Sequence, residues 1–144
     1  MIEFKISDYT SEDYKGLIEL WQMTDLGNPK RGDDQSIIQN TIKIGGKLLI
    51  MKSVTENKII GSSWMTTDGR RLFLHHFGIH PDYQGKGFAN ILMDKSMEFA
   101  KSVGQQFKLE VHMNNEKAIK LYKKYGFEYL GDYQVYIIRD IRST

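Results

Sequence analysis

Alternating hydrophobic and polar residues predict several strands in this chain, and apolar residues at helical spacing predict four helices. Ile2, Phe4 and Ile6 alternate with polar residues at the start, which is typical of a strand with one buried face. The predicted order is a strand (2–7), two helices (12–24 and 35–44), three strands in an antiparallel meander (47–54, 58–67 and 70–79), a helix (88–103), a strand (106–112), a helix (116–125) and two strands (127–130 and 133–139).

Polar residues mark the starts of three of these helices. The expected N-caps are Ser11 for the first helix, Asp33 or Asp34 for the second, and Asn114 or Asn115 for the last. The chain has 144 residues and shows neither an internal repeat nor a linker-like segment. Since domains usually span about 100–200 residues, we expect one domain over residues 1–144.

Composition excludes several classes of function. With no cysteine, the chain has no disulfide framework, thiol nucleophile or thiolate metal site. The N-terminus lacks the pattern of a secretory signal, and no apolar stretch approaches the length of a membrane span, so we expect a cytoplasmic protein. The net charge is only +2, with both signs interspersed, which gives no support to a nucleic-acid partner.

A glycine-rich segment between a predicted strand and a predicted helix indicates an anion site. Gly85, Lys86 and Gly87 precede the first turn of the helix that starts at Phe88. The first N–H groups of a helix have no partners within it, and the helix dipole adds positive charge there. The segment lacks the patterns of a Walker loop and of a dinucleotide fingerprint. The prediction is therefore a phosphorylated ligand of another kind.

A second block joins the strand at 106–112 to the last helix through a polar turn. It reads Asn115-x-x-Ala118-Ile119-x-Leu121-Tyr122-x-x-x-Gly126-Phe127, and the earlier segment reads Gln84-x-x-Gly87-x-Ala89. These resemble the N-x-x-A-x-x-L-Y-x-x-x-G-F block and the Q/R-x-x-G-x-G/A motif of the GNAT superfamily of N-acetyltransferases. The element order over most of the chain is also similar to that family.

The resemblance implies the α+β GNAT fold, with helices on both faces of a mixed, mostly antiparallel sheet that splays around an acetyl-CoA cleft. Strand backbone would bond the pantetheine amides, loop amides would hold the pyrophosphate, and the last helix would contact the pantetheine arm. The implied cofactor-binding residues are Phe77, Gly78, Ile79, Gln84, Gly85, Lys86, Gly87, Phe88, Ala89, Asn115, Ala118 and Tyr122.

The same resemblance implies an acetyl transfer to a primary amine by direct attack, with Tyr122 as the acid that protonates the departing sulfur. A tyrosine hydroxyl remains protonated at neutral pH and can donate. Three residues are candidates for the base. Glu110 lies 12 positions before Tyr122, as in the acetyltransferases of ribosomal-protein N-termini, and partial burial would suit it to this role. His75 and His76 are the others, and strand alternation predicts that only one of them faces the cleft.

The sequence does not identify the amine that accepts the acetyl group. The loop between the first two helices offers Asp25, Asp33 and Asp34 to a cation, whereas Lys30, Arg31, Arg70 and Arg71 would suit an anion, and Tyr133 is a further candidate for the acceptor site. No metal site is expected. Small-molecule and peptide amines both remain candidates, as do a monomer and a homodimer. The alternative is a non-catalytic regulatory module that binds coenzyme A.

Overall fold

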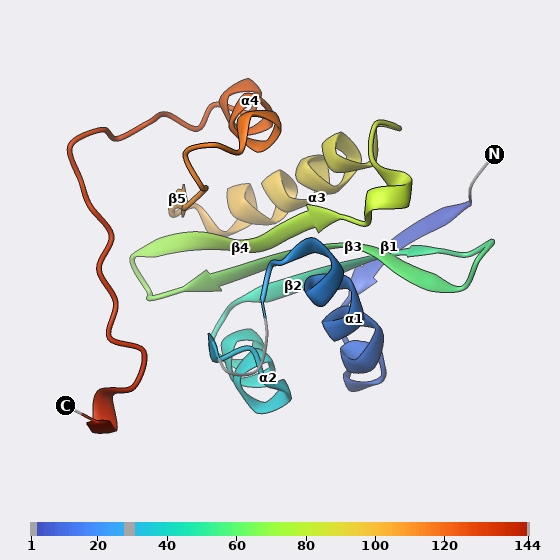
Figure 1. Ribbon diagram of the computed structural model, residues 1–144, viewed down its shortest axis with the longest axis horizontal. Coiled ribbons are helices and arrows are strands. Elements are labelled where there is room, and N and C mark those ends of the chain that lie inside the picture. Colours follow the sequence, from blue (N-terminus) through green and yellow to red (C-terminus); the bar gives the residue numbers. More distant parts are fainter. Residues whose placement is uncertain (1–2, 28–30, 144) are drawn as a thin grey trace. The chain divides into compact units, whose positions relative to one another are not determined.

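The computed structural model describes residues 3–27 and 31–143, in two compact parts that are treated separately, residues 1–110 and 111–144. The first part contains one sheet and three α-helices (Figure 1). Short 3-10 turns lie at Ser11–Asp13 and Pro81–Tyr83. Its elements are β1 (Phe4–Asp8), α1 (Tyr14–Thr24), α2 (Gln35–Lys43), β2 (Lys47–Ser53), β3 (Lys58–Thr67), β4 (Arg71–Ile79), α3 (Phe88–Val103) and β5 (Gln106–Leu109).

The sheet has the order β1-β2-β3-β4-β5. Its first four strands pair antiparallel, as the predicted meander requires. β5 pairs parallel to β4, because α3 crosses from one end of the sheet to the other between them. α1 and α2 lie on one face and α3 on the other (Figure 1). The expected mixed, mostly antiparallel sheet with helices on both faces is confirmed.

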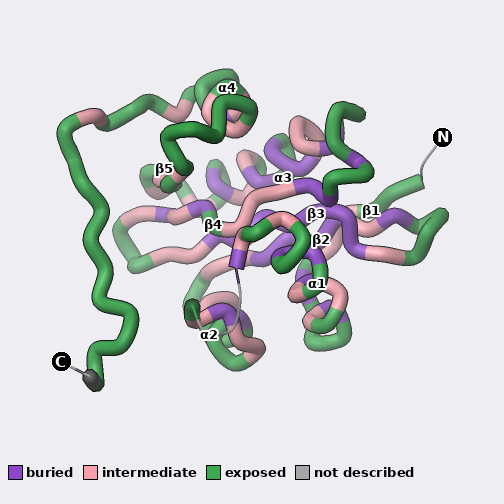
Figure 2. The backbone as a smooth tube through the Cα atoms, viewed as in Figure 1, coloured by how far each residue is buried: buried purple, intermediate pink, exposed green. Residues whose placement is uncertain are grey.

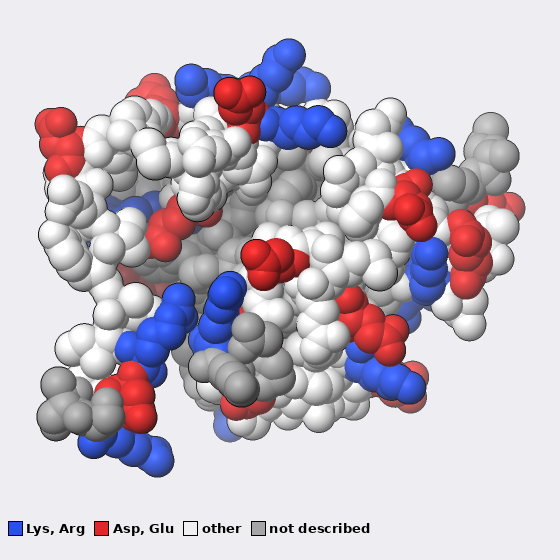
Figure 3. Space-filling model, viewed as in Figure 1, with Lys and Arg blue, Asp and Glu red and all other residues white. Residues whose placement is uncertain are grey.

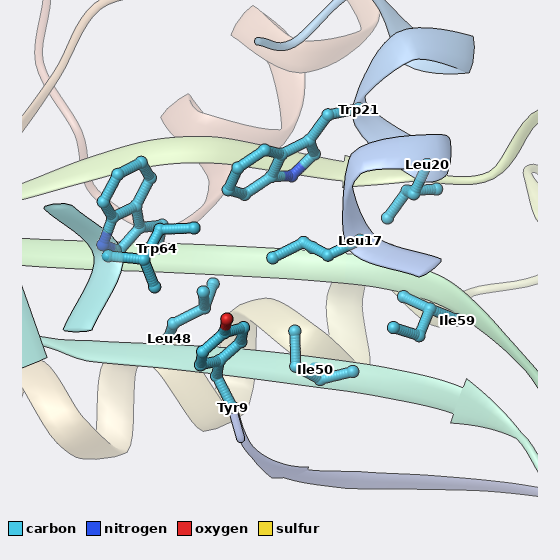
Figure 4. Packing of buried hydrophobic residues seen from close by; sticks show 9 residues of the cluster. Tyr9, Leu17, Leu20, Trp21, Leu48, Ile50, Ile59 and Trp64 are labelled. Atoms are coloured by element: carbon cyan, nitrogen blue, oxygen red, sulfur yellow. The ribbon is translucent and has the colours of Figure 1, made fainter. Parts of the chain in front are cut away.

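The hydrophobic core on the α1 side of the sheet is built around two tryptophans. Trp21 of α1 and Trp64 of β3 are buried, and their rings stack with centroids 5.6 Å apart (Figure 4). Figure 2 shows that burial is concentrated in the central strands. Burial of each large side chain stabilises the fold by roughly 1.5–3 kcal/mol. The cluster also contains Tyr9, Leu17, Leu20, Ile38, Leu48, Ile50 and Ile59.

The N-cap of the first helical segment differs from the prediction. Thr10, not Ser11, is the capping residue: its amide donates to Oδ2 of Asp13 (2.9 Å), and the Asp13 amide donates back to the carbonyl of Thr10 (2.9 Å). A 3-10 turn over Ser11–Asp13 then leads into α1. For α2 the prediction named Asp33 or Asp34, and Asp34 is the cap: its Oδ1 accepts from the Ile37 amide at 2.9 Å.

The second part contains the helix α4 (Glu116–Lys124) and a 3-10 turn at Ile141–Ser143. Asn115 caps α4 by accepting from the Ala118 amide at 3.3 Å. At the other end, the amide of Phe127 donates to the carbonyl of Tyr122 and that of Gly126 to the carbonyl of Lys123. With Gly126 at φ 96°, these bonds form a Schellman motif.

Two predicted strands do not form, and one is shorter than predicted. Residues 127–130 and 133–139 contain no strand among the described residues, and β5 ends at Leu109 instead of residue 112. Tyr133, Val135 and Ile137 are exposed there. Alternation shows that a segment suits a sheet, but a strand also needs a hydrogen-bonding neighbour along its backbone. Without such a ladder these residues stay extended and irregular.

The surface carries both signs of charge. Figure 3 shows Lys and Arg interspersed with Asp and Glu on the face that it draws, in keeping with the balanced composition. Along the described residues, no helix is long and apolar enough to cross a membrane.

Candidate functional site

The two ladders of β4 end at different points. β4 and β5 pair from Arg71 with Gln106 as far as Leu74 with Leu109, whereas β4 continues beside β3 as far as Ile79 with Gly61. Five residues of β4 therefore follow the end of its ladder with β5. Backbone beyond the end of a ladder is where an extended ligand can add to a sheet. This stretch includes the predicted residues Phe77, Gly78 and Ile79.

A β-bulge lies within this stretch of β4. Trp64 pairs with His75 and Ser62 pairs with Gly78, so two residues of β4, His76 and Phe77, lie opposite Ser63 alone. His76 has φ 46°, in the left-handed region. Residues other than glycine adopt this backbone conformation at a cost of about 1–3 kcal/mol. This strain persists because surrounding contacts fix the bulge.

The bulge changes which way the two histidines point. Alternation along a regular strand predicts opposite directions for His75 and His76, but both rings pack against the Trp64 ring, with centroids 6.0 and 5.3 Å from it. The two imidazole centroids are 6.5 Å apart. The prediction that only one of them faces a given side is therefore wrong, because the extra residue in the bulge breaks the period of two.

His76 lies against an aspartate from the loop between α1 and α2. Its Nε2 is 3.0 Å from Oδ2 of Asp33, and the two side chains are 18 % and 7 % exposed. Nε2 itself is buried, and its N–H direction is not aligned for a hydrogen bond, so the contact in this conformation is electrostatic. Trp21 and Trp64 flank the ring edge to face, at 4.5 and 5.3 Å between centroids.

His75 has different surroundings. Its Nε2 is 2.9 Å from the hydroxyl of Thr66, and its ring stacks on Phe73. Desolvation by this packing, followed by the neighbouring charge of His76, lowers the pKa of His75. Although His75, His76 and Asp33 lie near one another, no group of three potential metal ligands is found among the described side chains.

The glycine-rich segment precedes α3 as predicted. Gly85 and Gly87 have φ of 76° and 86°, and a Cβ at either would meet open space, so glycine is needed there for its backbone and not for packing. The first helical bond of α3 runs from the Ile91 amide to the carbonyl of Gly87, and the amides of Phe88 and Ala89 therefore precede the helical ladder. Lys86 is exposed beside them.

Gln84 links the glycine segment to β4. Its Nε2 donates to the carbonyl of Ile79 at 2.9 Å, so the last residue of β4 is tied to the loop before α3. The strand edge and the helix N-terminus are thereby held in a fixed relation within the first part of the chain.

Glu110 follows β5 directly, one residue beyond the last pair with β4. Its side chain is exposed, so the partial burial expected for it is not found.

In the second part, Tyr122, which is the predicted acid, makes a structural contact. Its ring packs edge to face on Phe127, 5.8 Å between centroids, which is the hydrophobic contact of the Schellman motif. Burial raises the pKa of Tyr122 to about 12. The hydroxyl therefore stays protonated over the physiological range and can act as a donor.

The loop residues considered for the acceptor have local partners. Asp34 caps α2, and Asp33 faces His76. Nε of Arg71 donates to Gln106 at 3.2 Å. Asp25 is exposed at the end of α1, and Arg31, Arg70 and Tyr133 are exposed as well, while Lys30 lies outside the described residues.

A separate depression of about 410 Å³ lies between α1 and the β2–β3 hairpin. Glu19, Lys52 and Lys58 are among its lining residues, and none of the predicted site residues lines it. It is therefore distinct from the predicted site at the end of β4.

Three residues near His76 were not predicted as site residues: Trp21, Ser62 and Gly27. Nε1 of Trp21 donates to Oγ of Ser62 (2.8 Å), and that hydroxyl donates to the carbonyl of His76 (2.7 Å). A Cβ at Gly27 would collide with Asp33 and His76. No sequence signal marks these roles, because they depend on the bulge.

Comparison with known proteins identifies the family. The model of the acetyltransferase (GNAT) family matches residues 14–127. The chain belongs to this family. It is therefore a GNAT acetyltransferase.

Individual relatives agree with this assignment. An acetyltransferase of Yersinia pestis (strain Pestoides F) is 29 % identical over 125 residues, covering 86 % of this chain and 87 % of the relative. An acetyltransferase structure from Streptococcus agalactiae superposes with a TM-score of 0.79 at 20 % identity, covering 94 % of this chain and 91 % of that one. A GNAT structure from Elizabethkingia anophelis with acetyl-CoA bound gives 0.62 at 19 %, covering 87 % and 76 %.

Proposed function

We propose that residues 1–144 form one N-acetyltransferase domain that acetylates a primary amine of a small molecule or peptide by direct attack on the thioester. The amine nitrogen bonds to the acetyl carbon, the carbon–sulfur bond breaks, the amine loses a proton, and the sulfur gains one. The observation that carries the proposal is that the ladder between β4 and β5 ends at Leu74 while β4 continues to Ile79, next to the glycine segment before α3. Extended backbone and helix N-terminus suit the two halves of coenzyme A.

Within this proposal, the backbone of Phe77, Gly78 and Ile79 bonds the pantetheine amides. The amides from Gln84 to Ala89 hold the pyrophosphate, with Lys86 adding a charge-assisted contact. The support is the stretch of β4 beyond the end of its ladder with β5, the left-handed glycines and the N-terminus of α3. Asn115 and Ala118 are assigned to the pantetheine arm by the family motif.

Tyr122 is proposed as the acid for the departing sulfur, because its raised pKa keeps the hydroxyl protonated. Tyr122→Phe removes only that hydroxyl and keeps the ring contact with Phe127. We expect kcat to fall by about 100-fold or more, and the acetyl-CoA dissociation constant measured by calorimetry to change far less. Tyr125→Phe, at the C-cap of the same helix, is the matched control and should leave kcat unchanged. If Tyr122→Phe also leaves kcat unchanged, the acid assignment is wrong.

The acceptor is tested with a panel of spermidine, L-lysine, kanamycin and a peptide with a free N-terminal alanine, read by thiol release. Robust thiol release that depends on one of these amines supports the proposal. If folded protein binds acetyl-CoA but acetylates none of them, the proposed acceptor class is wrong.

A further inference from the structure

The base in this reaction has three candidates, Glu110, His75 and His76, and their surroundings differ sharply. Glu110 is exposed beyond the end of β5, and His75 contacts a neutral hydroxyl. Only His76 combines a strained backbone, a buried carboxylate partner and a ring packed against two tryptophans.

The backbone of His76 is fixed by a buried chain of hydrogen bonds. The indole N–H of Trp21 donates to the Ser62 hydroxyl, which in turn donates to the carbonyl of His76. Trp21 and Ser62 are both fully buried. The bulge therefore places the imidazole in one position, as a reacting group requires, and the left-handed φ of His76 is the strain that this placement involves.

The orientation of the ring follows from its two edges. Gly27 and Asp33 cover the edge that carries Nε2 and Cδ2, and Nε2 is buried. The His76 side chain as a whole retains 18 % exposure, and Nε2 is its one nitrogen among the buried, unpartnered atoms of the described residues. Nδ1 is the ring atom opposite the edge that Gly27 and Asp33 cover. A carboxylate beside Nε2 favours the tautomer with the proton on that nitrogen and leaves the Nδ1 lone pair available.

We propose that His76 is the residue that takes the proton from the amine, through Nδ1, and that Asp33 is the positioning residue that holds its Nε2. This rests on the proposed function. During attack the amine proton moves to Nδ1, and the imidazolium that forms is stabilised by the Asp33 carboxylate. The hydrogen bond that is misaligned in the free protein aligns in the reacting complex. His76 then returns the proton to solvent.

The test measures kcat/KM against pH with the best amine of the panel, for the wild type and four variants. The titratable groups around the ring are Asp33 and His75. His76→Asn suits the left-handed backbone, because asparagine tolerates positive φ. We expect it to lower kcat by about 100-fold or more and to abolish the acid limb of the profile. Asp33→Asn keeps the shape of the side chain but removes its negative charge. We expect it to lower kcat by about tenfold and to move the acid limb to lower pH.

Two matched variants separate this proposal from its competitors. His75→Gln and Glu110→Gln should keep the acid limb, and acetyl-CoA binding by calorimetry should be unchanged in all four variants. If Glu110→Gln or His75→Gln removes the acid limb while His76→Asn keeps it, His76 is not the base although the enzyme acetylates amines. If Asp33→Asn lowers kcat without moving the limb, Asp33 has only a structural role. If the wild type acetylates no amine of the panel, the proposed function fails and this proposal with it.

Discussion

Gly27→Ala tests the contact between Asp33 and His76 without changing either residue. An alanine Cβ at position 27 would lie 2.8 Å from Cδ2 of His76, and still closer to Nε2 of His76 and Oδ2 of Asp33. Ordinary contact begins near 3.4 Å, so Cδ2 must retreat by about 0.6 Å and the two polar atoms by more. The methyl group therefore separates the carboxylate from the imidazole.

The expected loss of kcat in Gly27→Ala follows from this displacement. A misplacement of about 1 Å in a reacting group can lower a rate by about 100-fold, so we expect kcat to fall by about 10- to 100-fold. Forcing a methyl group into a packed site also costs about 1–3 kcal/mol of stability, measured as the free energy of unfolding in urea. Acetyl-CoA binding should stay at its wild-type level, because residue 27 is not among the predicted cofactor-binding residues.

Gly16→Ala provides the matched control. Gly16 lies in α1, and its added Cβ would meet Cδ1 of Ile59 at 3.2 Å, which a flexible side chain can accommodate. It should keep kcat and gain up to about 1 kcal/mol from helix propensity. Steady-state kinetics at saturating acetyl-CoA give kcat for both variants, and urea unfolding curves give their free energies of unfolding. A folded Gly27→Ala protein with wild-type kcat would refute the link between this contact and turnover.

Two further predictions concern stability. Ser62→Ala leaves the buried Trp21 N–H and the His76 carbonyl without their partner, so we expect the free energy of unfolding in urea to fall by about 1–3 kcal/mol; a loss below about 0.5 kcal/mol would contradict this. Burial alone would raise the pKa of Asp13, but hydrogen bonds from Lys52 and Thr10 outweigh it and hold that pKa below its usual value. The carboxylate therefore stabilises the fold above the unfolded-state pKa of about 3.9, and this contribution is lost as the pH falls through the lower folded-state pKa. Urea midpoints of the wild type should fall on acidification below about pH 4 more steeply than those of Asp13→Asn, and parallel curves would exclude the contribution.

Local pattern was sufficient for most elements of the fold. Periods of two and 3.6 predicted the meander and all four helices, because each reflects which side of a single element is buried. The motif from Asn115 to Phe127 also depends on contacts between near neighbours in the chain. Asn115 caps α4, and Gly126 and Phe127 end it in a Schellman motif. These residue types are dictated within a few positions of chain, so one sequence is enough to recognise them.

Other features depended on partners that are distant in the sequence. The alternation at 133–139 predicted a strand that does not form, because its existence depends on a neighbouring edge. The shared side of His75 and His76 depends on one extra residue in β4 relative to β3.

The sequence by itself determined the order of the elements from β1 to α4, the glycine segment before α3 and the residue types of the two motifs. Only the tertiary structure decided that Asp33 faces His76, that Gly27 leaves room for the pair, and that Trp21 and Ser62 fix the bulge. The physical reason is that helix caps and periodicity are set by near neighbours in the chain. A buried contact between a loop and a bulged strand is instead set by packing across the sheet.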